Sequence, residues 1–309
     1  MKILYYDCFC GISGDMNLAA LLDLGVDSDY IRRELSKLNL DSEYELTIKK
    51  DIKKGITGTR VDVVVKSEGE SHIHHSQEAE HSHNHAHLHS QEAESHTHVH
   101  THSQEAESHT HVHTPSQEAE HHHSHHHGQV EHHHHHQPHH EHRNLKDIED
   151  IINASSLSEQ VKIRSLQIFM KVAQAEAKVH GKSLYEVHFH EVGATDSIID
   201  IVGAAIALDA LKVDKVMASS IQLGGGFVKC AHGLIPVPAP ATVEILQGIP
   251  VKTGVVNFET TTPTGAAILA ASVETFTDHI DFSIDKIGYG IGHRELSIPN
   301  VLRVYLSNK

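Results

Sequence analysis

A histidine-rich segment, residues 72–142, constrains this chain most, because it separates two ordinary-looking segments with a run that cannot build a core. It holds 29 of the 35 histidines in the 309-residue chain and no lysine or arginine. The phrase Ser-Gln-Glu-Ala-Glu begins at Ser76, Ser90, Ser103 and Ser116, with His-x-His clusters between the copies. Low hydrophobicity and repetition are typical of disordered segments. We therefore predict a disordered insertion.

The side chains of this segment can bind metal ions. Neutral imidazole suits nickel, zinc and copper, and paired histidines on a flexible chain can chelate one ion together. We expect several weakly held ions, with the densest ligands at His121, His122, His123, His125, His126, His127, His132, His133, His134, His135 and His136. A pH-sensitive tail, whose imidazoles charge below a pKa of ~6.5, and a plain linker lengthened by repeat duplication are the alternatives.

The rest of the chain predicts an α/β or α+β fold. Roughly 240 residues remain outside the segment, enough for one large domain or two small ones. Neither side has enough strands for a convincing sheet alone. We therefore expect one interrupted domain, with residues 1–71 as its first part and residues 143–309 as its second.

Composition excludes several classes of protein. The formal charge of −16 argues against a nucleic-acid partner or a basic membrane surface. Three cysteines are too few for a disulfide framework, which fits a reducing cytoplasm. The N-terminus does not resemble a signal peptide, and no apolar run is long enough to span a membrane. We expect a cytoplasmic protein without nucleic-acid or membrane partners.

Apolar patterning predicts the individual elements. Before the segment, it indicates strands at residues 2–6, 44–50 and 59–66 and helices at residues 16–24 and 29–38. Ser13 or Asp15 is expected to cap the first helix and Ser28 the second. After the segment, the pattern indicates helices at residues 145–153, 158–180, 196–211, 241–246 and 265–271, and strands at residues 216–223, 286–292 and 301–306. Residues 185–192 are expected to be strand-like or extended.

The first candidate site follows the first strand. A carboxylate, a glycine turn and a helix start are the parts of an anion or metal site. Asp7 and Asp15 could hold a hard cation there, and Ser13 and Gly14 could contact a phosphate bridged to it. A tight strand–helix turn with Asp15 as its cap explains the same residues about equally well.

The second candidate site is denser. On an extended strand, His188 and His190 would face the same side, as two metal ligands must. Glu191 could turn inward at the strand end. Asp196 and Asp200 are four residues apart on a predicted helix and therefore share a face. Two imidazoles and up to three carboxylates so close together favour a functional site over a satisfied polar cluster.

Further groups could bind an anionic ligand through backbone, hydroxyl or cationic donors. The candidates are Gly224, Gly225, Gly226, His232, Thr262, Thr264, Gly265 and Arg294. A flexible loop with a surface histidine, a capped helix start and a solvated turn are the corresponding alternatives.

Taken in order, these motifs resemble the LarC family of nickel insertion proteins. The matching residues are the Gly-Ile-Ser-Gly-Asp-Met run within residues 7–16, His-Phe-His-Glu-Val-Gly at 188–193 followed by Asp-Ser-Ile at 196–198, the glycines at 224–226 with His-Gly at 232–233 and residues 236–240, Thr-Pro-Thr-Gly at 262–265, and Gly-x-Gly at 290–292 with Pro-Asn-Val-Leu at 299–302. The histidine-rich insertion also lies where the family has one.

The resemblance implies a nickel chelatase of the lyase class. Such a protein inserts Ni(II) into pyridinium-3,5-bisthiocarboxylic acid mononucleotide and makes the nickel-pincer cofactor of lactate racemase. CTP is hydrolysed, and a divalent cation such as manganese or magnesium assists. On this interpretation His188, His190 and Glu191 hold or transfer nickel. The carboxylates at Asp7, Asp15, Asp196 and Asp200 act nearby, and the glycine, threonine and arginine candidates bind the mononucleotide.

One departure from the family limits this interpretation. Full-length members continue into a C-terminal domain that holds the CTP site, whereas this chain ends at Lys309. We expect that domain on a separate or frameshift-fused polypeptide, since some members are encoded as two overlapping parts. The alternative functions are a non-catalytic nickel storage or delivery protein and a metal-dependent hydrolase of a phosphorylated small molecule.

Overall fold

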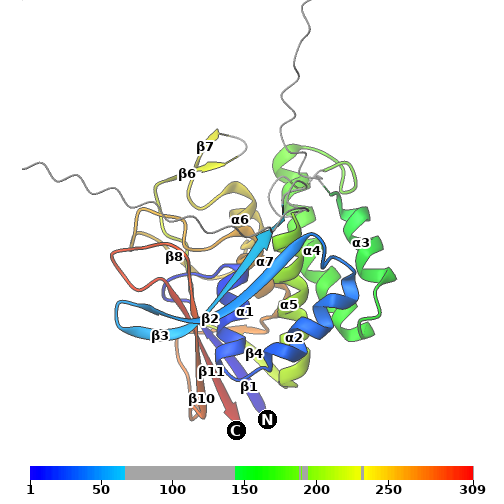
Figure 1. The fold of residues 1–309 in the computed structure, drawn as a ribbon. Helices are drawn as coiled ribbons and strands as arrows, with labels where there is room; N and C mark the ends of the chain where they lie inside the picture. The colour runs from blue at the N-terminus through cyan, green and yellow to red at the C-terminus, as the bar shows by residue number, and fades with distance from the viewer. Residues whose placement is uncertain (67–142, 188, 190–193, 231–232, 309) are drawn as a thin grey trace, which may run out of the picture. The chain divides into compact units, whose positions relative to one another are not determined.

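The computed structural model describes residues 1–66, 143–187, 189, 194–230 and 233–308 (Figure 1). Residues from both sides of the 67–142 segment share one mixed sheet, with strand order β2-β3-β10-β11-β1-β4-β9. This arrangement of helices and sheet confirms the predicted α/β class.

The N-terminal strand lies near the middle of the sheet. Strand β1 (Lys2–Asp7) pairs antiparallel with β11 (Val301–Asn308) on one side. On the other side it pairs parallel with β4 (Lys215–Ala218), which pairs parallel with β9 (Thr275–Phe276). The carboxyl ends of β1, β4 and β9 therefore meet at one edge of the sheet.

The far side of the sheet is a hairpin. Strands β2 (Tyr44–Lys53) and β3 (Ile56–Val65) are antiparallel, and β3 meets β10 (Lys286–Ile291). The other described strands form two small sheets. In one, β5 (Ile221–Gln222) pairs with β8 (Val251–Lys252), and in the other, β6 (Phe227–Cys230) pairs with β7 (Gly233–Pro236).

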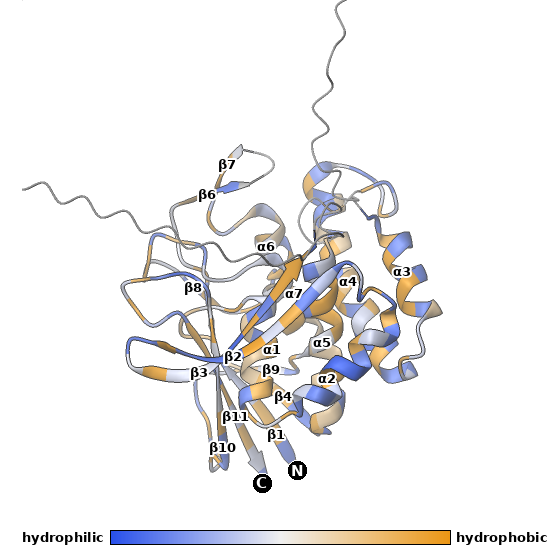
Figure 2. Ribbon diagram, in the orientation of Figure 1, coloured by the Kyte–Doolittle hydropathy of each residue, from blue (hydrophilic) through white to orange (hydrophobic). Residues whose placement is uncertain are grey.

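The helices build the core against one face of the sheet. Helix α1 (Gly14–Asp23) packs on β3 and β10, α5 (Thr195–Leu211) packs on α1, and α4 (Glu159–His180) packs on α5. The other helices are α2 (Ser28–Leu35) with the short turn η1 (Ser36–Leu38), α3 (Leu145–Ala154), α6 (Pro240–Ile245) and α7 (Pro263–Ser272). Figure 2 shows hydrophobic residues concentrated along α1 and α4, whereas the outer helix α2 is largely hydrophilic.

Strand β1 shows why the two faces differ. Its residues alternate, as the period of a strand requires. Leu4 and Tyr6 enter the main core, whereas Ile3 and Tyr5 join a small second cluster with Tyr305 on the opposite face. Among the described helices, none combines the length and the apolar character needed to cross a membrane.

Several predicted elements need correction. Asp27, not Ser28, caps α2, and its side chain accepts from the Asp29 amide at 2.9 Å. The predicted strand at 216–223 is two strands, because Ser219 and Ser220 between them bond elsewhere. Ser13 occupies the N-cap position of α1 without a capping side-chain bond, since its hydroxyl contacts Asp15 instead.

The stretch predicted as strand-like or extended at 185–192 is not a paired strand where it can be followed. Tyr185 and Glu186 lie in a turn, and Val187 and Phe189 are buried without strand pairing. The remaining positions of that prediction lie outside the described residues.

Candidate functional site

Three of the predicted carboxylates, Asp15, Asp196 and Asp200, line one pocket of about 550 Å³. Asp15 lies in the first turn of α1, and Asp196 and Asp200 lie in the first two turns of α5. The opposite wall comes from the β2–β3 hairpin and the loop after β10, through Lys49, Asp62, Val64 and His293. We call this the carboxylate pocket.

Asp200 has the least satisfied side chain in this pocket. Its Oδ1 is buried and has no hydrogen-bond partner among the described residues. Burial, followed by the negative charges of Asp15 and Asp196, raises the pKa of Asp200 well above its ordinary value. A cation bound here would supply the missing partner and offset the repulsion between the carboxylates.

Gly14 lets Asp200 reach this position. A Cβ atom at Gly14 would come within 2.4 Å of the Asp200 Oδ2. The glycine that the sequence placed beside a phosphate therefore serves as the contact between α1 and α5. Packing at this contact holds the Asp200 side chain against the start of α1.

His293 joins two carboxylates at the mouth of the pocket. Its Nε2 lies 3.0 Å from Asp15 Oδ2, and its Nδ1 lies 3.2 Å from Asp62 Oδ1 and 2.8 Å from an Arg60 nitrogen. The hydrogen bond to Asp15 raises the pKa of His293 against the opposing effect of burial. A neutral ring donates to Asp15 and accepts from Arg60, whereas a protonated ring donates to both carboxylates.

The two walls of the pocket differ in charge balance. Burial favours the neutral form of Asp62, but hydrogen bonds from Arg60 and Lys49 outweigh it and lower the pKa of Asp62. Asp62 is therefore an ion-paired anion, in contrast to Asp200. Asp200 Oδ1, the buried oxygen with no hydrogen-bond partner among the described residues, lies on the α1–α5 side, so that side is where a cation would gain most.

Asp7 lies elsewhere, although the sequence grouped it with Asp15. Its Oδ2 accepts from Arg303 Nε at 2.9 Å and from the Tyr305 hydroxyl at 3.1 Å. Asp7 lines a second pocket, at the carboxyl end of β1. The structure thus places the two ends of the predicted loop site in separate pockets.

The glycine candidates contact neighbouring backbone. A Cβ at Gly224 would come within 1.7 Å of the Phe258 carbonyl oxygen, and the Gly225 amide donates to that oxygen at 3.2 Å. Gly226 lies against Asn257 in the same way. These close contacts join two loops of the fold, and none of the three glycines lines the carboxylate pocket.

The threonine candidates begin α7. The Thr262 side chain accepts from the Gly265 amide at 3.2 Å, as a helix cap does, and Thr264 is buried. Gly265 packs on Ile12, since a Cβ there would come within 2.3 Å of the Ile12 carbonyl oxygen. Arg294 is exposed, and its carbonyl accepts from the Asn300 side chain at 3.2 Å. Its neighbour His293, rather than Arg294, lines the carboxylate pocket.

The remaining predicted ligands cannot be placed. His188, His190, Glu191, His232 and the histidines of the 72–142 segment all lie outside the described residues. Within the described ranges, no group of three or more His, Cys, Asp or Glu side chains is arranged to hold a metal ion. The three carboxylates of the pocket therefore do not form a complete metal site by themselves.

The described residues that flank the 67–142 segment meet at Glu43. The Lys66 amide donates to the Glu43 carbonyl at 2.8 Å, and the Arg143 guanidinium donates to the Glu43 carboxylate at 2.8 and 2.9 Å. The Thr195 hydroxyl donates to the same carboxylate at 2.6 Å. Thr195 precedes Asp196, so this junction adjoins the start of α5 and its pocket carboxylates.

Comparison with known proteins gives a consistent result. A family model described as nickel insertion protein matches residues 4–309. The chain is 57% identical to the pyridinium-3,5-bisthiocarboxylic acid mononucleotide nickel insertion protein of Clostridium kluyveri, over 100% of this chain and 63% of that protein. It is 60% identical to the Clostridium acetobutylicum protein of the same name, over 100% of this chain and 64% of that protein.

A putative nickel insertion protein of Maridesulfovibrio salexigens is 56% identical, over 100% of this chain and 63% of that protein. The chain thus spans less than two thirds of the length of these relatives. No solved structure matches it.

Proposed function

Because this chain belongs to the nickel insertion protein family, we propose that it supplies the metal-handling part of a chelatase. In the proposed reaction Ni(II) enters pyridinium-3,5-bisthiocarboxylic acid mononucleotide, the compound named in the titles of its relatives. The observation that supports this role is the buried Asp200 carboxyl beside Asp15 and Asp196, whose Oδ1 has no hydrogen-bond partner in the described part of the chain. The nickel ion is the cargo of this reaction.

The charge of the ion matches the need of the pocket. Burial and, after it, the charges of Asp15 and Asp196 raise the pKa of Asp200, and a divalent cation would offset that repulsion. Carboxylate oxygens alone are modest ligands for nickel, which accepts imidazole readily. We propose that His188, His190 and Glu191, which precede Asp196 in the chain, complete the ligand set. The sulfur atoms of the substrate would then receive the ion.

The histidine-rich segment is proposed as a nickel reservoir. Its many imidazoles favour weak binding of several ions and rapid exchange. The Glu43 junction supports a role near the pocket, because Lys66 and Arg143 both bond to Glu43 beside the start of α5. Loss of the segment would then lower activity mainly when nickel is scarce.

We assign CTP and its assisting manganese or magnesium ion to the further length of the relatives that this chain does not span. A C-terminal polypeptide, fused or separate, would bring them to the complex. The proposed location is the cytoplasm, where the cysteines of the chain remain reduced.

The decisive experiment combines the purified chain, the C-terminal polypeptide, the mononucleotide, CTP and Ni(II), with mass spectrometry of the product. We expect a nickel-containing product, and a loss of about tenfold or more at limiting nickel for Asp200→Asn, since a charged contact contributes roughly 1.5–3 kcal/mol. A His188→Ala/His190→Ala double variant should also lose insertion.

Asp209→Asn is the matched control, because Asp209 lies on the same helix and pairs at the surface with Lys212. Unchanged insertion by both site variants would exclude the assigned site. Nickel binding without any product would instead identify a storage or delivery protein, and release of phosphate from the mononucleotide would identify a hydrolase.

A further inference from the structure

The second pocket has the size and position of a small-molecule site. Its volume is about 600 Å³, within the usual range for such sites. Asp7, Ser219, Ser220 and Asp278 line it just where the parallel strands β1, β4 and β9 end. Open α/β sheets bind ligands at this edge, outside the carboxyl ends of their strands.

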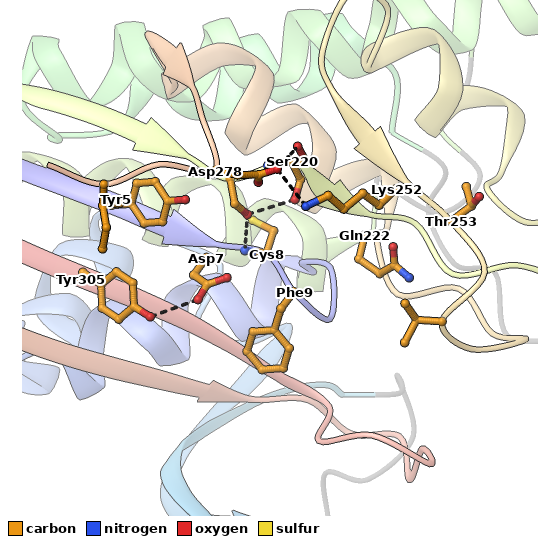
Figure 3. Close-up of a pocket in the computed structure, with 13 residues that line it drawn as sticks. Tyr5, Asp7, Cys8, Phe9, Ser220, Gln222, Lys252, Thr253, Asp278 and Tyr305 are labelled. Carbon is orange, nitrogen blue, oxygen red and sulfur yellow. Dashed lines mark hydrogen bonds and ion pairs between the residues drawn. The ribbon is translucent and has the colours of Figure 1, made fainter.

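The two sides of this pocket differ in chemistry. Figure 3 shows the rings of Tyr5, Phe9 and Tyr305 on one side, with Lys252 and Ser220 on the other. The Tyr5 and Tyr305 rings stack with their centroids 5.9 Å apart. A flat aromatic ligand with a polar tail at some distance would match this division.

On the polar side of this pocket, Asp278 accepts hydrogen bonds from the residues around it. Its carboxylate accepts from the Ser220 amide at 2.9 Å, from the Ser220 hydroxyl at 3.0 Å and from the Lys252 ammonium at 2.9 Å. One of three ammonium protons is used in the Asp278 bond, and the Lys252 side chain is 58% exposed. The remaining protons can reach an anionic group such as a phosphate.

Asp7 provides a fixed acceptor near the rings. Arg303 and Tyr305 both donate to its Oδ2, which leaves Oδ1 as the oxygen to which no described residue donates. The Arg303 guanidinium is held in turn over the Phe9 ring, 5.4 Å from its centroid. An ordered acceptor of this kind suits a ribose hydroxyl.

We infer that this aromatic pocket binds the pyridinium mononucleotide, with its ring at Phe9 and its phosphate at Lys252. This assignment rests on the proposed function. It separates the binding of the organic substrate from the handling of the metal in the carboxylate pocket. Residues 7–15 connect the two, since Asp7 and Phe9 line one pocket and Asp15 lines the other.

The test uses nicotinic acid mononucleotide, a pyridinium mononucleotide with a single carboxylate, and the full chain. Titration calorimetry should detect binding to the wild type, and Lys252→Met should weaken it about tenfold, the effect of losing one charged hydrogen bond. Phe9→Leu keeps an apolar side chain but removes the aromatic ring, and it should also weaken binding. Nicotinic acid riboside, which lacks the phosphate, should bind the wild type and Lys252→Met equally weakly.

Lys212→Met is the matched control, because Lys212 is also an exposed lysine paired with an aspartate, at 3.1 Å. It and Asp200→Asn should bind the mononucleotide as the wild type does. Absence of binding, or weakening by Asp200→Asn with none by Lys252→Met, would overturn the assignment. If Lys252-dependent binding is found but no nickel is inserted in the complete reaction, the proposed function fails and the binding site stands.

Discussion

The buried Asp200 carboxyl lowers the stability of the fold at neutral pH, because ionising it in the native state is unfavourable. Its raised pKa means that the native state holds a proton more tightly than the unfolded chain does. Stability therefore falls as the pH rises from the ordinary pKa of 3.8 toward the raised value. We predict that Asp200→Asn increases the free energy of unfolding at about pH 8 by on the order of 1 kcal/mol, measured by urea unfolding.

The same substitution should have little effect at about pH 3, where the wild-type carboxyl is mostly protonated in both states. Asp209→Asn, on the same helix, should produce no such gain at either pH. A loss of stability with Asp200→Asn at high pH would contradict this account. A variant that gains stability and loses nickel insertion would show that Asp200 is kept for function rather than for stability.

His293 gives a second pH dependence. Because its folded pKa is raised, its stabilising contribution is complete below the ordinary pKa of 6.5 and is lost as the pH rises through the folded value. We predict that His293→Gln lowers the free energy of unfolding by a few tenths of a kcal/mol at about pH 6, since the side chain is about half exposed.

The gap between wild type and His293→Gln should close by about pH 9, as followed by urea unfolding. A gap that stays constant with pH would mean that packing, not charge, holds the ring at Asp15 and Asp62.

The part of the carboxylate pocket that the sequence predicted consists of residues that are close together in the chain. Asp196 and Asp200 are one helical turn apart, so their common face followed from helix geometry. Asp62 and His293 join them from a hairpin and a distant loop, and no local pattern pairs those positions. The neglected signal was the histidine directly after the glycine-rich end of β10, where we favoured Arg294 instead.

At the scale of elements, two glycines let β10 lie against α1. A Cβ at Gly290 would come within 2.0 Å of the Met16 carbonyl oxygen, and one at Gly288 within 2.3 Å of the Ala20 carbonyl oxygen. We predict that Gly290→Ala lowers the free energy of unfolding by about 1–3 kcal/mol, because backbone must move to admit the methyl group. Chemical denaturation measures the change.

Gly225→Ala is the comparison, since its Cβ would meet only the Val256 carbonyl oxygen at 3.5 Å. Equal effects of the two substitutions would show that the contact with α1 does not determine the cost.

Element prediction succeeded where local signals were complete. Ser158 caps α4, whose buried side follows the helical period, and the left-handed Gly181 ends it. It failed at residues 216–223, where alternation continues through Ser219. There the hydroxyl accepts from the Cys8 amide at 2.9 Å, and that partner is 211 residues away in the chain.

At the scale of the whole molecule, the α/β class followed from mixed helix and strand patterns, but the strand order did not. Leu4 is opposite Leu306 in the sheet, and no local pattern pairs the two ends of a chain. The same long-range pairing brings Arg303 to Asp7 and so removes Asp7 from the carboxylate pocket. Tertiary contacts of this kind decided which predicted residues share a pocket.

The Glu43 junction makes a prediction for the intact chain. Replacing residues 72–142 by a short Gly-Ser linker should leave the melting temperature within about 2 °C of wild type, because Lys66 and Arg143 remain joined through Glu43. Insertion should be unchanged at saturating nickel and reduced at limiting nickel. Differential scanning calorimetry and the mass assay measure the two effects.

An unchanged deletion variant at limiting nickel would contradict the reservoir role. Glu43→Ala in the deletion background should lower the melting temperature further, because it removes the carboxylate that accepts from Arg143 and Thr195.

The junction at Glu43 also bears on how such a chain can change over generations. Once both flanks are fixed at one residue, each doubling of the intervening length costs only about 0.6 kcal/mol of closure entropy. Copies of Ser-Gln-Glu-Ala-Glu and their histidines can therefore be gained or lost with little effect on the fold. In the proposed reservoir role, the number of metal ions held would change with the number of copies while the folded part of the chain stays constant.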